Sequence, residues 1–173
     1  VFISLENNAQ LNHIRVQSNS EFTQNMANLY VNQQTDSHYD FFQLVDGGKL
    51  GRSNICVQLN GENAQCYINS LALSKNNQHI DNNIIVNHNS PQTHSSQFVK
   101  SILFDTSTGV FNGRTVVHEN AQKITAHQTN KNLLLSKKAK MSSNPQLEIY
   151  ADDVKCSHGS TTGQIDVDAL FYL

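Results

Sequence analysis

The densest chemistry in the chain lies in residues 152–159, where two carboxylates, a lysine, a thiol and an imidazole fall close together. If this stretch is extended, alternation places Val154, Cys156 and His158 on one face and the intervening residues on the other. A thiolate and an imidazole two residues apart can bind one soft metal ion. Zinc and iron–sulfur iron usually take four donors, so the remaining ligands would come from another chain or from a cluster.

The same segment also has a purely structural interpretation, in which Cys156 is buried and His158 is hydrogen-bonded. Unpaired cysteines are among the most buried residues in proteins. A Cys156/His158 dyad for nucleophilic catalysis would need an orienting third group, and the sequence identifies none. Asp152 and Asp153 are neighbours whose side chains point apart on a strand, so we expect a solvated turn or ion-pair element. Spacing alone leaves the metal-ligand and structural interpretations open.

The remaining cysteines and histidines indicate no second site. The chain has an odd number of cysteines, three, and none of them forms a Cys-x-x-Cys pair: Cys56, Cys66 and Cys156. This argues against a disulfide framework or a zinc finger. A reducing compartment, the cytoplasm, is therefore expected, with Cys56 and Cys66 as small buried hydrophobic residues. Seven further histidines lack the His-x-x-x-His spacing and acidic neighbours of a metal site, and we interpret most of them as solvated turn residues. They are His13, His38, His79, His88, His94, His118 and His127.

Length and charge exclude several classes of partner. The 173 residues indicate one domain. With 12 Lys+Arg against 14 Asp+Glu there is no basic stripe to bind nucleic acid. No stretch approaches the ~18–20 apolar residues of a membrane-spanning helix. The sequence also lacks the common Gly-rich phosphate loops, so it does not predict ATP or NAD binding.

Amides and short apolar runs predict an all-β chain. The sequence holds 22 Asn and 15 Gln, interleaved with apolar runs whose centres step by about 13 to 18 residues. Amides at matching positions of successive strands can form hydrogen-bonded ladders. Turn-forming residues separate the runs, and we predict turns at residues 46–48, 60–61, 76–77, 89–91, 112–113 and 144–145.

A repeated box predicts how the strands are arranged. Near copies of Glu-Asn-Ala-Gln surround Ala9, Ala64 and Ala121, which lie 55 and 57 residues apart. Each interval holds about four strand-and-turn units, so the box returns to the same corner of a coil after a whole number of rungs. The repeat favours a single-domain parallel β-helix. An antiparallel sandwich is the second interpretation, because Asn-Gly pairs also suit hairpins.

From about residue 105 onward the chain closely resembles the SufB/SufD family of iron–sulfur cluster assembly proteins, on the SufD side. The matching strings are Gly109-Val110-Phe111-Asn112-Gly113-Arg114 and Leu147-Glu148-Ile149-Tyr150-Ala151-Asp152-Asp153-Val154-Lys155-Cys156-Ser157-His158-Gly159, followed by Gly163-Gln164-Ile165-Asp166 and Leu170-Phe171-Tyr172. The resemblance implies a right-handed parallel β-helix, with residues 1–173 forming the core of a longer protein. The family's N- and C-terminal helical regions are absent from this sequence.

The resemblance also implies a role. It implies a non-enzymatic scaffold subunit that pairs with SufB and, through the missing regions, with the ATPase SufC. Cys156 and His158 match the family's Cys-x-His pair at the SufB/SufD junction, where an iron–sulfur cluster forms transiently, and we expect no cofactor in this fragment alone. Without a partner, we expect two copies to pair edge to edge through the apolar terminal run 170–173. The alternative function is a β-helical carbohydrate-active enzyme such as a polysaccharide lyase, although three scattered arginines suit it poorly.

Overall fold

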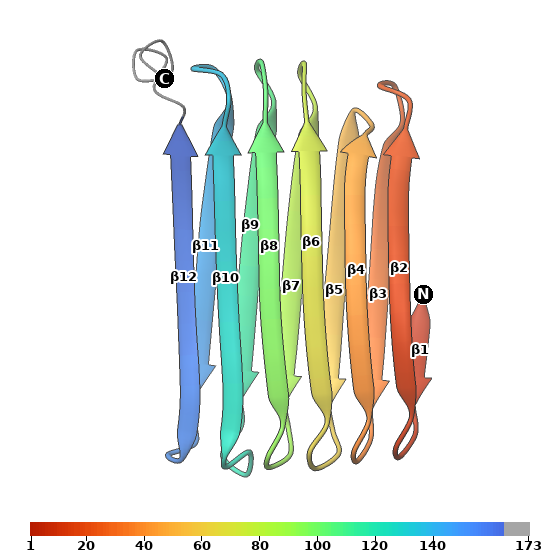
Figure 1. Cartoon of the computed structure of the whole chain (residues 1–173), viewed down its shortest axis with the longest axis vertical. Coiled ribbons are helices and arrows are strands. Elements are labelled where there is room, and N and C mark those ends of the chain that lie inside the picture. The colour runs from red at the N-terminus through yellow and green to blue at the C-terminus, as the bar shows by residue number, and fades with distance from the viewer. Residues whose placement is uncertain (165–173) are drawn as a thin grey trace, which may run out of the picture.

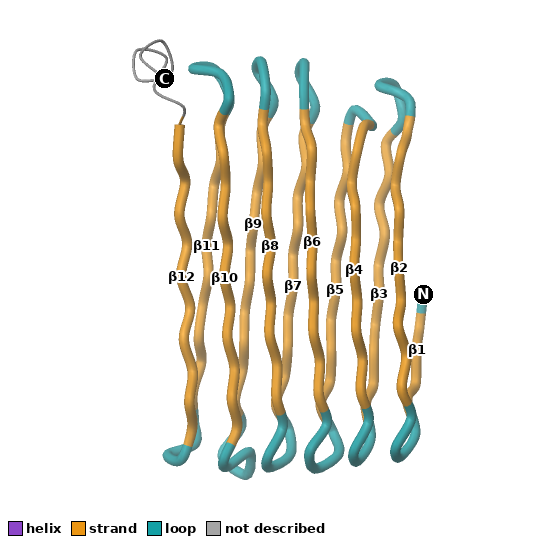
Figure 2. The backbone as a smooth tube through the Cα atoms, viewed as in Figure 1, coloured by secondary structure: helices purple, strands orange, loops and turns teal. Residues whose placement is uncertain are grey.

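The computed structural model describes residues 1–164, which form two parallel β-sheets and no helix (Figures 1 and 2). The strands in chain order are β1 (Phe2–Leu5), β2 (Gln10–Asn19), β3 (Gln24–Gln33), β4 (His38–Gly47), β5 (Leu50–Leu59), β6 (Gln65–Ser74), β7 (His79–His88), β8 (His94–Leu103), β9 (Thr108–Val117), β10 (Ile124–Leu134), β11 (Lys140–Ile149) and β12 (Val154–Gln164). Residues 1–164 contain no helix that is long and apolar enough to cross a membrane.

The chain alternates between the two sheets. The odd-numbered strands form one sheet in the order β1-β3-β5-β7-β9-β11, which we call sheet A. The even-numbered strands form sheet B, in the order β12-β10-β8-β6-β4-β2. Each strand of residues 1–164 therefore lies beside the strand two places along the chain, in parallel. The predicted β-solenoid is confirmed, and the antiparallel sandwich is wrong.

The repeated box marks every second coil at one corner of the solenoid. Ala64 and Ala121 are fully buried, directly before or near the start of β6 and β10. The coils that lack the box have other small residues at this corner: Ser37, Thr93 and Ala151, all buried. Several residues that precede these corners have left-handed backbone: Asn8, Asp36, Asn63 and Gln92 have φ between 57° and 62°. One repeat thus spans two coils and four strands, as the sequence predicts.

Alternate side chains of every strand point between the sheets and form the core. Val31, Phe41, Ile68, Val86 and Phe111 are among its fully buried apolar members. Polar side chains share this interior and bond to one another. The Gln43 amide donates to Ser70 Oγ at 2.9 Å and to Asn82 Oδ1 at 2.8 Å. Such pairing offsets the cost of burying amides.

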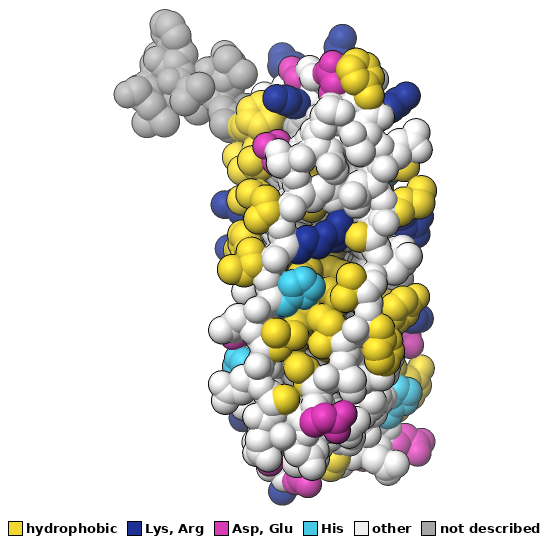
Figure 3. Space-filling view, turned by 90° about the vertical axis from the view of Figure 1, so that its right-hand side faces the viewer, with side chains coloured by type: hydrophobic (Ala, Val, Ile, Leu, Met, Phe, Trp, Pro, Cys, Tyr) yellow, Lys and Arg dark blue, Asp and Glu magenta, His cyan; other side chains and the backbone are white. Residues whose placement is uncertain are grey.

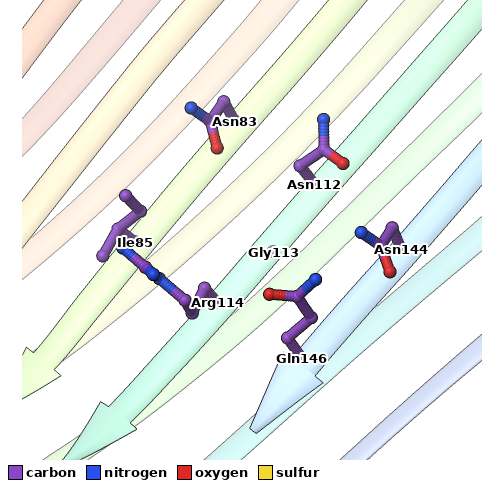
Figure 4. A pocket seen from close by; sticks show the side chains of 7 residues that line it. All are labelled: Asn83, Ile85, Asn112, Gly113, Arg114, Asn144 and Gln146. Carbon is purple, nitrogen blue, oxygen red and sulfur yellow. The ribbon is translucent and has the colours of Figure 1, made fainter. Parts of the chain in front are cut away.

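A second set of amides runs along the outer face of sheet A. Its members occupy one register column on five successive strands: Asn28, Asn54, Asn83, Asn112 and Asn144. The Asn54 amide donates to Asn28 Oδ1 at 2.8 Å. Figure 4 shows Asn83, Asn112 and Asn144 side by side on three strands of this face. The predicted column of amides at matching positions is therefore present, and Asn28 and Asn54 are its one hydrogen-bonded neighbouring pair within residues 1–164.

Two predicted turns are strand interior instead. Residues 112–113 lie within β9 and residues 144–145 within β11. Gly113 is required because a Cβ there would lie 2.5 Å from Gln128 Nε2. Pro145 is tolerated because β11 is an edge strand that pairs only with β9, so its missing N–H need not serve a second neighbour.

Both ends of the described coil expose core-facing positions. Figure 3 looks onto the N-terminal end and shows hydrophobic side chains between the rims of the two sheets. This part of the chain also carries large exposed apolar residues at outward-facing strand positions, among them Ile14, Val16, Met26 and Tyr30. At the other end β11 and β12 are the edge strands. The apolar run 170–173, on which the expected pairing of two copies rests, lies outside the described residues.

Candidate metal-ligand site

The segment that holds Cys156 and His158 forms β12, the edge strand of sheet B. β12 pairs with β10 on one side and with no described strand on the other. Val154 and Cys156 pack against the core cluster that contains Val117 and Ala126. Lys155 and Ser157 face outward, and His127 Nδ1 meets Ser157 Oγ at 2.7 Å on that outer face. The predicted alternation of faces is confirmed.

Cys156 is half-buried at the open end of the solenoid. It lies in register with Ala126, a small residue that is itself buried. Burial raises the pKa of the Cys156 thiol, and a backbone hydrogen bond with Ala126 offsets part of that rise. The thiol of the isolated chain is therefore a poor nucleophile at neutral pH, because the thiolate is the reactive species. A metal would have to displace its proton on binding.

His158 occupies the next inward position of β12. Ser160, two residues further on, also points inward, because its hydroxyl lies 2.7 Å from Ser143 Oγ of β11 across the core. His158 lies between these two inward residues and is exposed. Its register partner on β10 is the buried Gln128. The imidazole is therefore available at the open end, beside the thiol.

The two residues do not form a complete metal site by themselves. Within residues 1–164 no group of three or more His, Cys, Asp and Glu side chains could hold a metal ion. Asp152 and Asp153 are exposed in the turn before β12, as predicted. Cys156 and His158 thus supply two donors, and any remaining ligands must come from outside the described chain.

The structure corrects two predictions about the other thiols and imidazoles. Cys66 is fully buried as expected, but Cys56 is half-buried on the outer face of sheet A. Ile55 and Val57, on either side of Cys56, both point inward, so Cys56 points outward. The interpretation of most histidines as turn residues is wrong: His13, His38, His79, His88, His94 and His127 all lie in strands, and only His118 of that set lies outside one.

Two of those histidines are core-facing, and hydroxyls hold them. His88 is fully buried, with Nδ1 2.7 Å from Thr93 Oγ1 and Nε2 2.8 Å from Ser95 Oγ. Burial lowers the pKa of His88 to about 3. His13 Nδ1 lies 2.9 Å from the hydroxyl of Tyr39. Neither joins a metal-binding group in residues 1–164.

Sequence reasoning missed the side chain that neighbours His158. Gln128 belongs to no local motif, but it lies 30 residues before His158, one coil of the solenoid. A search at the coil period would have found it. A surface hollow of about 310 Å³, lined by Asn112 and Arg114 among others, is on the outer face of sheet A and away from β12 (Figure 4).

The comparisons with known proteins agree with this geometry. Residues 1–173 match the family described as SUF system FeS cluster assembly, SufBD core domain. The iron–sulfur cluster assembly protein SufD of Escherichia coli (strain K12) is 40% identical over 171 residues, which cover 99% of this chain and 40% of that protein. An iron–sulfur cluster assembly SufBD family protein of Synechocystis is 35% identical over 99% of this chain and 38% of its own length.

A plant relative extends the similarity. The chloroplastic protein ABCI7 of Arabidopsis thaliana is 35% identical over 98% of this chain and 36% of its own length. The chain thus spans about two-fifths of the length of the curated relatives it matches. The chain belongs to the SufBD core-domain family of iron–sulfur cluster assembly proteins.

Proposed function

We propose that this chain is the β-helical core of a SufD-type scaffold subunit, and that Cys156 and His158 contribute ligands to a nascent iron–sulfur cluster. The observation that carries the proposal is the placement of a thiol and an imidazole side by side, facing inward, on the edge strand that ends the described coil. The E. coli relative is named an iron–sulfur cluster assembly protein, which supports the same role. The chain would act by binding and positioning rather than as an enzyme.

The chemistry follows from an incomplete ligand set. Two donors hold iron weakly, because cluster iron usually takes four ligands. Iron and sulfide are here the cargo, and the other donors would come from a SufB-like subunit docked at the β12 end. A site divided between two chains releases its cluster when either side rearranges, which suits transient assembly. Metal binding would deprotonate Cys156, so assembly is favoured as pH rises toward the thiol pKa.

The free edge of β12 supports pairing with that partner. An unpaired edge strand presents a row of backbone donors and acceptors that a second chain can extend. We propose a SufB-like partner for this edge and, when none is present, an edge-to-edge homodimer. Light scattering at micromolar concentration tests the homodimer: a monomer mass that does not change with concentration would exclude it. A SufC-like ATPase would bind through regions outside this chain, and the three unpaired cysteines support the cytoplasm as compartment.

The proposal is tested in a full-length SufD-type chain, purified anaerobically with its SufB-like and SufC-like partners. Cys156→Ala and His158→Ala should each abolish cluster assembly, followed by visible absorbance, without dissociating the complex. Both side chains are partly or fully exposed, so each change should cost only about 1 kcal/mol of stability.

Matched controls are available in the same chain. Cys56→Ala removes another half-buried thiol, and His127→Ala removes an exposed imidazole that faces outward on the neighbouring strand. Both controls should assemble clusters as the wild type does. Wild-type assembly in Cys156→Ala and His158→Ala would refute the site. A large fall in melting temperature in either would instead favour the structural interpretation of the pair.

A further inference from the structure

Gln128 holds an unused hydrogen-bond acceptor beneath the last described strand. Its side chain is buried, at 1% exposure. Its Nε2 donates to Gln97 Oε1 at 3.2 Å, and Gln97 Nε2 donates in turn to Thr115 Oγ1 at 3.0 Å. These bonds fix the direction of the Gln128 amide. Its Oε1 has no partner within residues 1–164, and buried acceptors without partners are rare enough to need a cause.

The surroundings of Gln128 keep its amide in place. Gly113 of β9 leaves out a Cβ that would lie 2.5 Å from Gln128 Nε2 and 2.9 Å from its Cδ. The same Cβ would lie 2.5 Å from Phe111 Cζ, so any larger residue at position 113 would displace this amide or the Phe111 ring. The sequence therefore makes room for Gln128 at a point where an apolar side chain would fill the core at lower cost.

Gln128 has two neighbours in its register column, Gln97 on β8 and His158 on β12. Gln128 and His158 are partners in the pairing of β10 and β12, and both face the interior. Paired parallel strands lie ~4.8 Å apart. Beyond β12 no described strand continues the column. Side chains at paired inward positions of neighbouring strands are close enough for a change of rotamer to bring an imidazole N–H to an amide oxygen, which can accept its hydrogen bond.

The other core-facing imidazoles in the described chain are held by hydrogen bonds to side-chain hydroxyl groups. His88 bonds through both ring nitrogens, to Thr93 and Ser95, and His13 bonds through Nδ1 to Tyr39. His158 differs, because none of the side-chain hydrogen bonds found in residues 1–164 includes it. Among residues 1–164, the exposed imidazole of His158 has no side-chain hydrogen bond and the buried Gln128 Oε1 has no partner, and the two residues occupy neighbouring positions of one column.

We propose that Gln128 Oε1 accepts one ring N–H of His158 when a partner subunit closes the β12 end, and so directs the lone pair of the other ring nitrogen at the cluster. This inference rests on the proposed function of His158. Metal-binding histidines usually donate their second nitrogen to an oxygen acceptor, which fixes the tautomer and the ring orientation. Gln128 is thus a positioning residue, held in turn by Gln97 and Thr115.

The test observes the tautomer of His158 directly. A full-length SufD-type chain labelled with ¹⁵N-histidine is assembled with unlabelled SufB-like and SufC-like partners, without iron, and ¹⁵N chemical shifts are recorded at pH 8. The His158 signals are assigned by their loss in His158→Gln. We expect one tautomer in the wild type and a mixture in Gln128→Leu. Gln128→Glu, which keeps an acceptor oxygen, should restore one tautomer.

A matched control separates this effect from a general disturbance of the core. Gln43→Leu removes an equally buried glutamine on β4, three coils away, and should leave His158 unchanged. If Gln128→Leu does not fold, Gln128→Met removes the acceptor and keeps the unbranched shape. Equal tautomer populations in the wild type and in the acceptor-free variant would overturn the proposal.

Cluster assembly distinguishes this inference from the function on which it rests. Gln128→Leu should slow assembly by about 10–100-fold, the usual effect of losing the partner of a metal-binding histidine. If His158→Ala abolishes assembly while Gln128→Leu changes neither rate nor tautomer, the proposed function stands and this inference falls. If His158→Ala assembles clusters normally, the proposed function falls, and the tautomer experiment still decides whether the hydrogen bond forms.

Discussion

The middle and the end of the solenoid hold the same two types of side chain, cysteine and histidine, at different depths. Cys66 and Cys156 occupy one inward register column, three coils apart. Cys66 is fully buried, and burial raises the pKa of its thiol strongly. His88, also in the middle, is buried with a pKa near 3. At the end Cys156 is half-buried and His158 exposed. Position along the solenoid, rather than residue type, therefore decides whether a cysteine and a histidine can reach a ligand.

Thiol modification should show the largest difference between the two regions. Cys66 reacts only when the coil opens, so we expect a native-state rate at least about 10³-fold below that of Cys156. Alkylation at pH 8, with peptide mass spectrometry to assign each site, measures both rates. Cys56 on the outer face serves as the accessible reference. Similar rates at Cys66 and Cys156 would contradict the burial difference.

Core truncation should differ between the regions as well. Ile84→Ala removes a fully buried side chain from β7 and should cost about 2–5 kcal/mol. Leu147→Ala removes a half-buried side chain from β11, where solvent fills part of the space, and should cost about 1–2 kcal/mol. Chemical denaturation measures the free energy of unfolding of both variants, and the comparison holds when their m-values are the same. A greater loss at Leu147 would mean that the last coil, and not the middle, dominates stability.

Acid should destabilise the middle of the solenoid through His88. The folded pKa of about 3 lies below the ordinary value of 6.5, so between these values the unfolded chain binds more protons than the native chain. This contribution to stability is complete above about pH 6.5 and falls by up to about 1.4 kcal/mol per pH unit as pH drops toward 3. Denaturation curves from pH 8 to 4 test it. His88→Gln should flatten the curve, and an unchanged slope would refute the assignment.

Much of the fold could be predicted because the repeat reports the coil directly. The boxes around Ala9, Ala64 and Ala121 mark the same corner of every second coil, where a small residue is partly or fully buried. β2 gives a weak apolar signal, because polar residues separate its apolar Leu11, Ile14 and Val16. Residues 112–113 were assigned to a turn because Asn-Gly carries that preference locally, whereas pairing of β9 with β7 and β11 holds both residues in a strand.

The candidate site could be predicted only in part. Alternation correctly placed Cys156 and His158 on one face, since period two holds for any strand. The direction of Cys56 was missed because Ile55-Cys56-Val57 is an apolar triplet, although the polar Asn54 and Gln58 share the face of Cys56 and indicate that it points outward. Gln128 was missed because its relation to His158 depends on the coil length, and register pairs such as Gln24–Leu50 and Thr108–Lys140 show coils that vary from 26 to 32 residues.

Amide substitutions should produce the smallest effects and separate the interior from the surface. Asn54→Ala removes one exposed hydrogen bond of the outer ladder and should cost at most about 1 kcal/mol. Gln43→Ala leaves Ser70 and Asn82 without their buried partner and should cost more, about 1–3 kcal/mol for the unpaired groups alone. Thermal unfolding of the two variants provides the comparison. Equal costs would mean that the inner amides contribute no more than the outer ladder.

Hydrogen exchange in the presence of the partner tests most directly the claim that the β12 end is completed by another chain. Peptides from β12 and from β2, the edge strands of sheet B in the described chain, are compared in a full-length SufD-type protein with and without a SufB-like subunit. We predict slower exchange across Val154–Gln164 on complex formation and no change across Gln10–Asn19. Protection confined to β2, or none at β12, would contradict the account.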